Sequence, residues 1–419
     1  MRNVMAMGMV VTLAACSKAG GGARWEGTVT DSAGVQVVRN PDVGMWRPED
    51  RWTLTEVLRI GTAEGDPEYQ FGAIPAVSGL AIASDGRIVA VDLQARHLKV
   101  FTPQGTYERT IGGPGAGPGE FGIQGLQVVI APGDTLVVSD QGNQRVSLFL
   151  LDGTFVRSFP QNFVDGFAFR WDAAEDGRLV TQLRRVALPG NTAAPDTMDV
   201  VAERTLDGGF GDTLLRVPSG KTFSFSGGAP EWTLFVPEPL WAFWGDRMLY
   251  AVSDVYRIEV YGPDARLERV IEKPFTLHPL TEVDQKVILK GFEKIFKEQG
   301  LPPQFVPQFL ERVHFTEHYP AFGQGGMAKG PDGSIMVQLV RAISQMTPEE
   351  QASIDFQSGG GSPDWDVFDR DGRYLGVLTM PPRFQPIEFV GDRIYGTQKD
   401  ELDVQSIVVL DVVKHAAGG

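Results

Sequence analysis

Short apolar runs, separated by turns that contain Gly or Pro, extend along most of this chain. Runs of this length bounded by turn residues are typical of β-strands. Asp-Gly pairs such as Asp85-Gly86 and Asp152-Gly153 join several of them, and glycine accepts positive φ in such hairpin turns without steric cost. The pattern predicts an all-β fold built from antiparallel hairpins.

The runs recur with a period of roughly 50 residues, a spacing at which propellers must be considered first. One copy covers residues 60–105 and a second covers residues 111–153, each with a buried strand that ends in Asp (Asp92, Asp140). Degenerate copies continue toward the C-terminus, so that six units fit the length. A unit of four antiparallel strands joined by short hairpins is a propeller blade.

The two ends of the repeat array complement each other. Residues 52–58 form an apolar strand before the first unit, and the last unit has no clear fourth strand. Pairing the two leaves no strand edge exposed. We therefore predict a six-bladed β-propeller over residues 51–415 that is closed by its N-terminal strand.

Residues 280–319 depart from the strand pattern. The apolar positions Val283, Val287 and Phe292 fall near one helical face, Thr281 can cap the helix and Gly300 can end it. A second, shorter helix is predicted over residues 305–313. The sequence thus predicts a small helical insertion between the fourth and fifth units, and an exposed loop over residues 344–363.

Two motifs in the second unit resemble the repeats of NHL-type six-bladed propellers: the Gly-Pro-Gly-Glu-Phe run at residues 117–121 and the Asp-x-x-x-x-Arg-Val stretch at residues 140–146. The resemblance is good over residues 60–160 and implies the same fold. Some six-bladed propellers are calcium-dependent lactonases or lyases that hold the metal at the central channel. An enzyme of that kind is the alternative to a binding protein.

The N-terminus has the layout of a secretory signal, with Arg2, an apolar segment over residues 4–15 and a Leu-Ala-Ala-Cys ending at Cys16. The segment is too short to span a bilayer. Its ending resembles the lipobox of bacterial lipoproteins, which implies a signal peptide over residues 1–15, acylation of Cys16 and, from Ser17, sorting to the outer membrane. Residues 16–50 would then be a lipidated tether and N-terminal extension. An ordinary signal with a chance cysteine is the alternative.

The composition limits the classes of partner that the protein can bind. The net charge of −15 and the pI near 4.9 argue against nucleic acid. No later segment offers about 18 uninterrupted apolar residues, so the lipid is the only predicted membrane contact. Cys16 is the only cysteine, so the mature chain has no disulfide or thiol chemistry. We expect a monomer.

A basic residue follows the second strand of each unit, and these residues are Arg96, Arg145, Arg184 with Arg185, Arg257, Arg341 and Lys399. In equivalent blades such loops open on one face, where the cations could form a ring that binds a carboxylate or phosphate. Alternatively, each arginine pairs with an aspartate of its own unit (Asp92, Asp140, Asp254) and braces the loop. Trp241 and Trp244 are predicted to form an exposed contact surface.

Catalytic chemistry is not evident. His314 to His318 follows the His-x-x-Glu-His order of some zinc peptidases, but Pro320 would end the helix and no third ligand follows. We therefore assign no catalytic residue and no cofactor, with calcium or zinc as the alternative. The sequence predicts a lipid-anchored binding module for a protein partner or for a small anionic or saccharide-like ligand.

Overall fold

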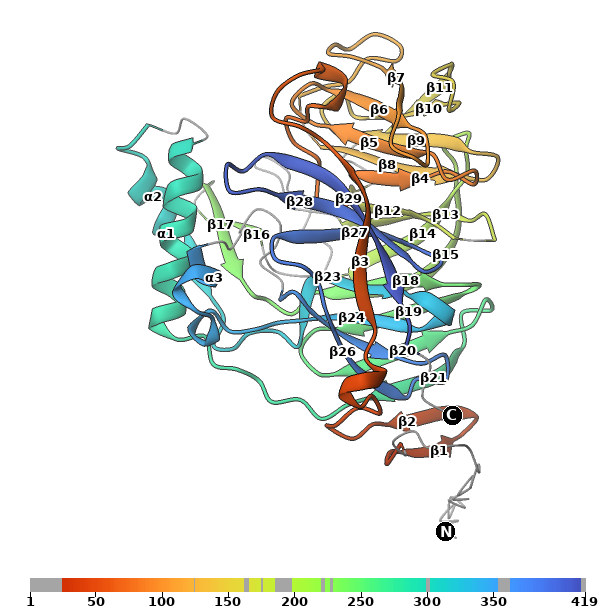
Figure 1. The fold of residues 1–419 in the computed structure, drawn as a ribbon, viewed down its shortest axis with the longest axis vertical. Helices are drawn as coiled ribbons and strands as arrows, with labels where there is room; N and C mark the ends of the chain where they lie inside the picture. The colour runs from red at the N-terminus through yellow and green to blue at the C-terminus, as the bar shows by residue number, and fades with distance from the viewer. Residues whose placement is uncertain are drawn as a thin grey trace, which may run out of the picture.

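The computed structural model describes residues 25–415, apart from residues 124, 162–165, 175, 185–197, 220–222, 227–228, 299–301 and 353–361. The predicted signal peptide, Cys16 and Arg185 lie outside the described residues. Six of its sheets contain a four-stranded antiparallel meander, and these six are the blades of a propeller (Figure 1). The predicted fold class is confirmed.

The first three blades follow one another along the chain. Blade 1 contains β4 (Leu80–Ile82), β5 (Ile88–Asp92), β6 (His97–Phe101) and β7 (Tyr107–Ile111). Blade 2 contains β8 (Leu126–Ala131), β9 (Thr135–Asp140), β10 (Arg145–Phe149) and β11 (Phe155–Pro160). Blade 3 contains β12 (Phe167–Ala173), β13 (Leu179–Arg184), β14 (Met198–Arg204) and β15 (Phe210–Pro218).

The other three blades include the closure. Blade 4 contains β18 (Pro239–Trp244), β19 (Arg247–Val252), β20 (Arg257–Tyr261) and β21 (Leu267–Glu272). Blade 5 contains β23 (Phe322–Lys329), β24 (Ile335–Leu339), β25 (Asp364–Phe368) and β26 (Tyr374–Thr379). Blade 6 contains β27 (Phe384–Val390), β28 (Arg393–Lys399), β29 (Gln405–Val413) and, from the N-terminal side, β3 (Thr53–Ile60).

Strand β3 closes the ring as predicted. It runs antiparallel to β29, with Ile60 opposite Ile407 and Thr53 opposite Val413. Both isoleucines are buried. The first strands of neighbouring blades contact one another, which makes them the innermost strands around the propeller axis.

Burial explains the sequence pattern within a blade. All five residues of β5 are buried, whereas β7 alternates between half-buried and exposed positions until Ile111. A strand covered by neighbouring blades on both faces must be apolar throughout, and an outermost strand needs only one apolar face. Hydrophobic clusters accordingly lie between successive blades, as between β5 and β9.

The segment before β3 is packed on the outer rim. A hairpin of β1 (Thr28–Ser32) and β2 (Val35–Arg39) extends blade 4, with β2 parallel to β21. The chain then passes the 3-10 turn η1 (Pro48–Asp50) and follows blade 5, where Trp46 N donates to Leu375 O at 2.7 Å. The predicted extension therefore spans the edges of two blades before the chain enters blade 6.

The connections from blade 3 to blade 4 and from blade 4 to blade 5, together with the connection between β24 and β25 within blade 5, build an accessory layer. It contains β16 (Phe223–Ser226), β17 (Ala229–Leu234), β22 (Val313–Phe315), α1 (Glu282–Glu298), α2 (Val306–Leu310), η4 (Ile343–Gln345) and α3 (Pro348–Ala352). The helices and β16 and β17 lie together at one side of the blades in Figure 1. The helical insertion was predicted, but its second helix is shorter than residues 305–313 because the chain turns into β22.

The prediction of a loop over residues 344–363 was wrong in part, because α3 lies within this segment. Thr347 and Glu350 form a capping box there, with Thr347 N donating to Glu350 Oε2 at 2.7 Å and Glu350 N donating to Thr347 Oγ1 at 3.2 Å. Such reciprocal bonds satisfy free amides at a helix start. Within the described residues no helix is both long and apolar enough to cross a membrane.

Candidate functional site: a charged cluster at the propeller axis

The predicted basic residues lie at equivalent places. Arg96 is in the turn between β5 and β6, and the other described members stand beside the same second-to-third connection of their blades. In a four-stranded meander these connections and the links between blades share one face, called here the loop face. The first-to-second and third-to-fourth turns share the opposite face, called here the turn face.

Arg145 braces a link between blades. Its guanidinium donates to Ala116 O at 3.0 Å and to the carbonyls of Gly117 and Glu120 at 2.7 Å. The aspartates of the first two units brace their loops through backbone amides: Gly72 N donates to Asp92 at 3.1 Å, and Gly122 N donates to Asp140 at 3.1 Å. Bracing is thus present, but the partners are backbone groups rather than the predicted arginine–aspartate pairs.

Three other members have carboxylate partners. Arg184 contacts Asp199 at 2.7 Å and Glu238 at 3.0 Å. Arg257 contacts Glu272 at 2.8 Å, and Arg341 contacts Glu350 at 2.7 Å. Arg96 and Lys399 are half-buried at the same level. A role of this set in ligand binding stays a prediction.

Trp241 is not part of an exposed surface, which corrects the prediction for this residue. Its side chain is only 1% exposed because it packs between blades 3 and 4. The indole Nε1 donates to Gln182 Oε1 at 2.8 Å. Trp244, at the end of the same strand, is half-buried and donates from Nε1 to Gly333 O at 2.9 Å.

The innermost strand of blade 3 carries two charges at the axis. Arg170 and Asp172 lie two residues apart on β12 and form an ion pair of 3.0 Å. Arg170 is held in place by Trp241, whose carbonyl accepts from Nη1 at 2.6 Å and whose ring lies 4.6 Å from the guanidinium carbon. The two side chains are 33% and 28% exposed, so solvent reaches them at the axis.

Glu388 brings a third charge to the axis from blade 6. It lies on β27 beside a register shift between Pro386 and Glu388, and such bulges redirect a side chain. Among the described residues its carboxyl has no hydrogen-bond partner. Burial, and then the negative charge of Asp172, raise the pKa of Glu388 to about 8, while Arg170 acts against the rise.

Asp172 and Glu388 therefore differ in their environments. Burial raises the pKa of Asp172, but Arg170 opposes the rise by charge and by hydrogen bonding. A carboxylate held by an arginine and a carboxylic acid that keeps its proton near neutrality can act as acceptor and donor to one molecule. Paired carboxyls with different proton affinities are also the usual arrangement of acid–base sites. We call Arg170, Asp172 and Glu388 the axial cluster.

Sequence analysis did not find the axial cluster. Its members come from the third and sixth blades, and no local motif joins them. The available signal was a charge inside an apolar innermost strand, as in Phe-Arg-Trp-Asp at residues 169–172 and Ile-Glu-Phe at residues 387–389. Because the innermost strands carry few charged residues, such charges could have been placed at the axis.

The His-x-x-Glu-His order does not form a helical metal site. His314 lies in strand β22, 3.8 Å from Glu231, and His318 pairs with Pro279 in an isolated bridge. Two histidines spaced for one face of a helix lose that relation in extended chain. The described residues contain no group of three or more His, Cys, Asp or Glu side chains placed to hold a metal ion.

Comparison with known proteins shows the fold. The sequence matches no described protein family and no curated protein. Among solved structures, the Bacteroides fragilis protein named "Putative exported protein" aligns over 90% of this chain and 100% of its own, with 11% identity and a TM-score of 0.51. The shared property is the propeller.

Two enzymes also align, at lower scores. Virginiamycin B lyase from Staphylococcus aureus covers 87% of this chain and 100% of its own, with 8% identity and a TM-score of 0.44. A gluconolactonase from Xanthomonas campestris covers 88% of this chain and 99% of its own, with 12% identity and a TM-score of 0.41. At these identities the comparisons do not transfer an activity. The NHL type of the repeats stays a prediction.

The raised pKa of Glu388 predicts a pH-dependent effect on stability. The unfolded chain releases this proton near the ordinary pKa of 4.5, whereas the folded protein keeps it until about pH 8. The unfolded state therefore binds fewer protons in between, and stability falls as pH rises through this window. At about 1.36 kcal/mol per pKa unit, Glu388→Gln should stabilise the protein by a few kcal/mol at pH 9 and by little at pH 4. Urea unfolding at both pH values measures this difference, and an equal effect at both would contradict the assignment.

Proposed function

We propose that this protein is an exported, lipid-anchored binding module that takes a small, hydroxyl-rich, saccharide-like ligand at the axial cluster. The observation that carries the proposal is the combination of a donating carboxyl (Glu388), an accepting carboxylate (Asp172) and a fixed guanidinium (Arg170) at one accessible place. Hydroxyl groups donate and accept hydrogen bonds, so one ligand of this class satisfies all three side chains.

The rigid setting supports binding. Trp241 connects Arg170 to Gln182, which donates to the buried Asp199 at 2.7 Å. A side chain fixed by such a network loses little freedom when a ligand arrives. Closure by β3 holds the third and sixth blades at a constant separation. The carboxyls of Asp172 and Glu388 therefore keep the same position relative to each other.

Binding should depend on the proton of Glu388. A panel of neutral mono- and disaccharides, titrated by calorimetry at pH 6.5, should yield at least one saturable binder. Affinity should fall as pH rises through about 8, because the donor is lost. Glu388→Gln keeps a donor and should remove the pH dependence while retaining binding. Glu388→Ala should abolish binding, and Glu64→Ala, at an exposed loop position, is the control.

The same experiment separates a second candidate function, an acid–base enzyme. The pair of carboxyls with different proton affinities favours it, since Glu388 can give a proton while Asp172 receives one. In that case Glu388→Gln would bind the sugar or its lactone but abolish turnover. If no saccharide binds and none is turned over, the assignment to the axial cluster is wrong.

The export and anchoring part of the proposal has its own test. It is supported by the Leu-Ala-Ala-Cys ending at Cys16 and by the name of the Bacteroides fragilis neighbour. Cells grown with a labelled fatty acid should incorporate it into the wild-type chain but not into Cys16→Ala. The variant should also leave the outer-membrane fraction, because two or more acyl chains are needed for stable anchoring. Equal labelling of both chains would contradict lipidation at this residue.

A further inference from the structure

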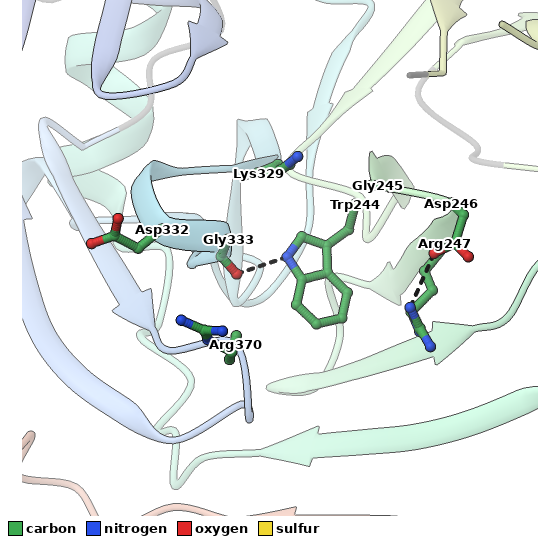
Figure 2. Close-up of a pocket in the computed structure, with 8 residues that line it drawn as sticks. All are labelled: Trp244, Gly245, Asp246, Arg247, Lys329, Asp332, Gly333 and Arg370. Atoms are coloured by element: carbon green, nitrogen blue, oxygen red, sulfur yellow. Dashed lines mark hydrogen bonds and ion pairs between the residues drawn. The ribbon is translucent and has the colours of Figure 1, made fainter. Parts of the chain in front are cut away.

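A pocket on the turn face, separate from the axial cluster, lies between blades 4 and 5. Its volume is about 240 Å³, and its walls include Trp244, Asp246 and Arg247 from blade 4 and Lys329, Asp332 and Arg370 from blade 5. Figure 2 shows the Trp244 indole at its centre, between Arg370 on one side and Arg247 on the other. The Trp244–Gly333 hydrogen bond of 2.9 Å fixes the ring.

The acidic side chains of this pocket already have cationic partners. Asp246 lies 3.0 Å from Arg247, which also contacts Glu268 at 2.8 Å. Asp332 lies 2.9 Å from Lys414, which comes from the end of the chain. Lys414 also contacts Asp392 at 2.8 Å, so each of the two cations is shared between two carboxylates, and both acids of the pocket are engaged by a cation.

Arg370 differs from its neighbours. It lies in the turn between β25 and β26 and is exposed, and its guanidinium has no partner among the described residues. Its guanidinium is therefore available to a ligand beside the half-buried indole of Trp244. Guanidinium binds carboxylate and phosphate groups bidentately, and an indole face accepts a flat apolar surface.

We propose that this pocket binds a small acidic ring compound, namely a sugar-sized ring that carries a carboxylate or phosphate. The anionic group lies on Arg370, and the ring covers Trp244. The volume of about 240 Å³ is below the roughly 300–1,000 Å³ typical of sites for drug-sized ligands, so the pocket itself holds a single ring.

The test uses full-length Glu388→Ala, in which saccharide binding at the axial cluster is removed, with four probes: D-glucuronate, glucose 6-phosphate, D-glucose and inorganic phosphate. Calorimetry should detect saturable binding of at least one acidic sugar, and at least tenfold weaker binding of glucose and of inorganic phosphate. The comparison of the two acidic sugars identifies which anionic group is preferred. If glucose bound as tightly as the acidic sugars, the anionic group would not be what the pocket recognises. If inorganic phosphate bound as tightly, the sugar ring would not contribute to recognition.

Two variants, each made in the Glu388→Ala protein, assign the binding to the pocket. Arg370→Gln removes a side chain that makes no described contact, so the fold should persist while affinity drops at least tenfold. Trp244→Phe keeps an aromatic ring in place and should weaken binding by a smaller factor. Arg266→Gln, an 85% exposed arginine in a turn of the same face, should bind as the Glu388→Ala protein does. Unchanged affinity in Arg370→Gln, or no binding of any probe, would overturn the proposal. Because the binding is measured in Glu388→Ala, the pocket stays distinct from the axial cluster.

Discussion

Replacing Asp199 by alanine should destabilise the protein by about 3–5 kcal/mol, the cost of breaking a buried ion pair from one side. Asp199 has no solvent exposure and Arg184 is 7% exposed. Its carboxylate accepts from Arg184 at 2.7 Å, from Gln182 at 2.7 Å and from Ser219 at 2.5 Å. Removing it leaves the buried Arg184 and Gln182 and the half-buried Ser219 without this acceptor, and only Arg184 keeps another carboxylate, Glu238 at 3.0 Å. Urea unfolding followed by far-UV circular dichroism measures the loss.

The matched control is Asp411→Ala. Asp411 also lies on the third strand of its blade and contacts an arginine, Arg393 at 2.9 Å, but the two side chains are 38% and 48% exposed. Exposed pairs contribute at most about 1 kcal/mol. The double variant Arg184→Met/Asp199→Leu should lose less than Asp199→Ala alone, because no unpaired charge stays buried. Similar losses in Asp199→Ala and Asp411→Ala would mean that the network is not the source of the stability.

The blades were predictable because each one is a local unit. The second strand of blade 1, for example, is an apolar run over residues 88–91 that ends in Asp92 before a turn, and such a pattern can be recognised in the sequence alone. The axial cluster was not predictable in the same way. Arg170 and Glu388 are more than 200 positions apart in the sequence, and only ring closure brings their blades to opposite sides of one axis. Their proximity is a property of the whole ring rather than of any repeat.

The segment on the outer rim (residues 28–50) and the accessory layer show a second limit of prediction from the sequence. Strand β2 adds to blade 4 in parallel with β21, although nothing in Val35–Arg39 distinguishes an edge partner from an unpaired extension. The exposure of Trp241 was misjudged for a related reason. Trp241, on the innermost strand of blade 4, is covered by blade 3, and the sequence shows the strand but not this neighbour.

Substituting Ile60 by aspartate should unfold the closure, with a loss of at least about 4 kcal/mol. Ile60 is 2% exposed, pairs with Ile407 across the β3–β29 ladder and belongs to the cluster between blades 6 and 1. An aspartate there is a buried charge with no partner. Because β3 is the only N-terminal strand in blade 6, its release also opens an unpaired edge at β29. Loss of the near-UV circular dichroism signal and a lower urea midpoint measure the effect.

Val57→Asp, on the same strand, is the control that separates the effect of losing the closure from a general effect of placing an aspartate in β3. Val57 is 45% exposed and faces away from the core, so its substitution should change stability by roughly 0.5 kcal/mol or less. Opening the ring should also disturb the axial cluster, since β27 and β3 belong to one sheet with β28 and β29 between them. The Ile60→Asp protein should therefore lose the pH dependence assigned to Glu388 at urea concentrations where Val57→Asp keeps it. Equal midpoints for the two variants would show that the ring stays intact without β3, and the fixed distance between Asp172 and Glu388 would then need another cause.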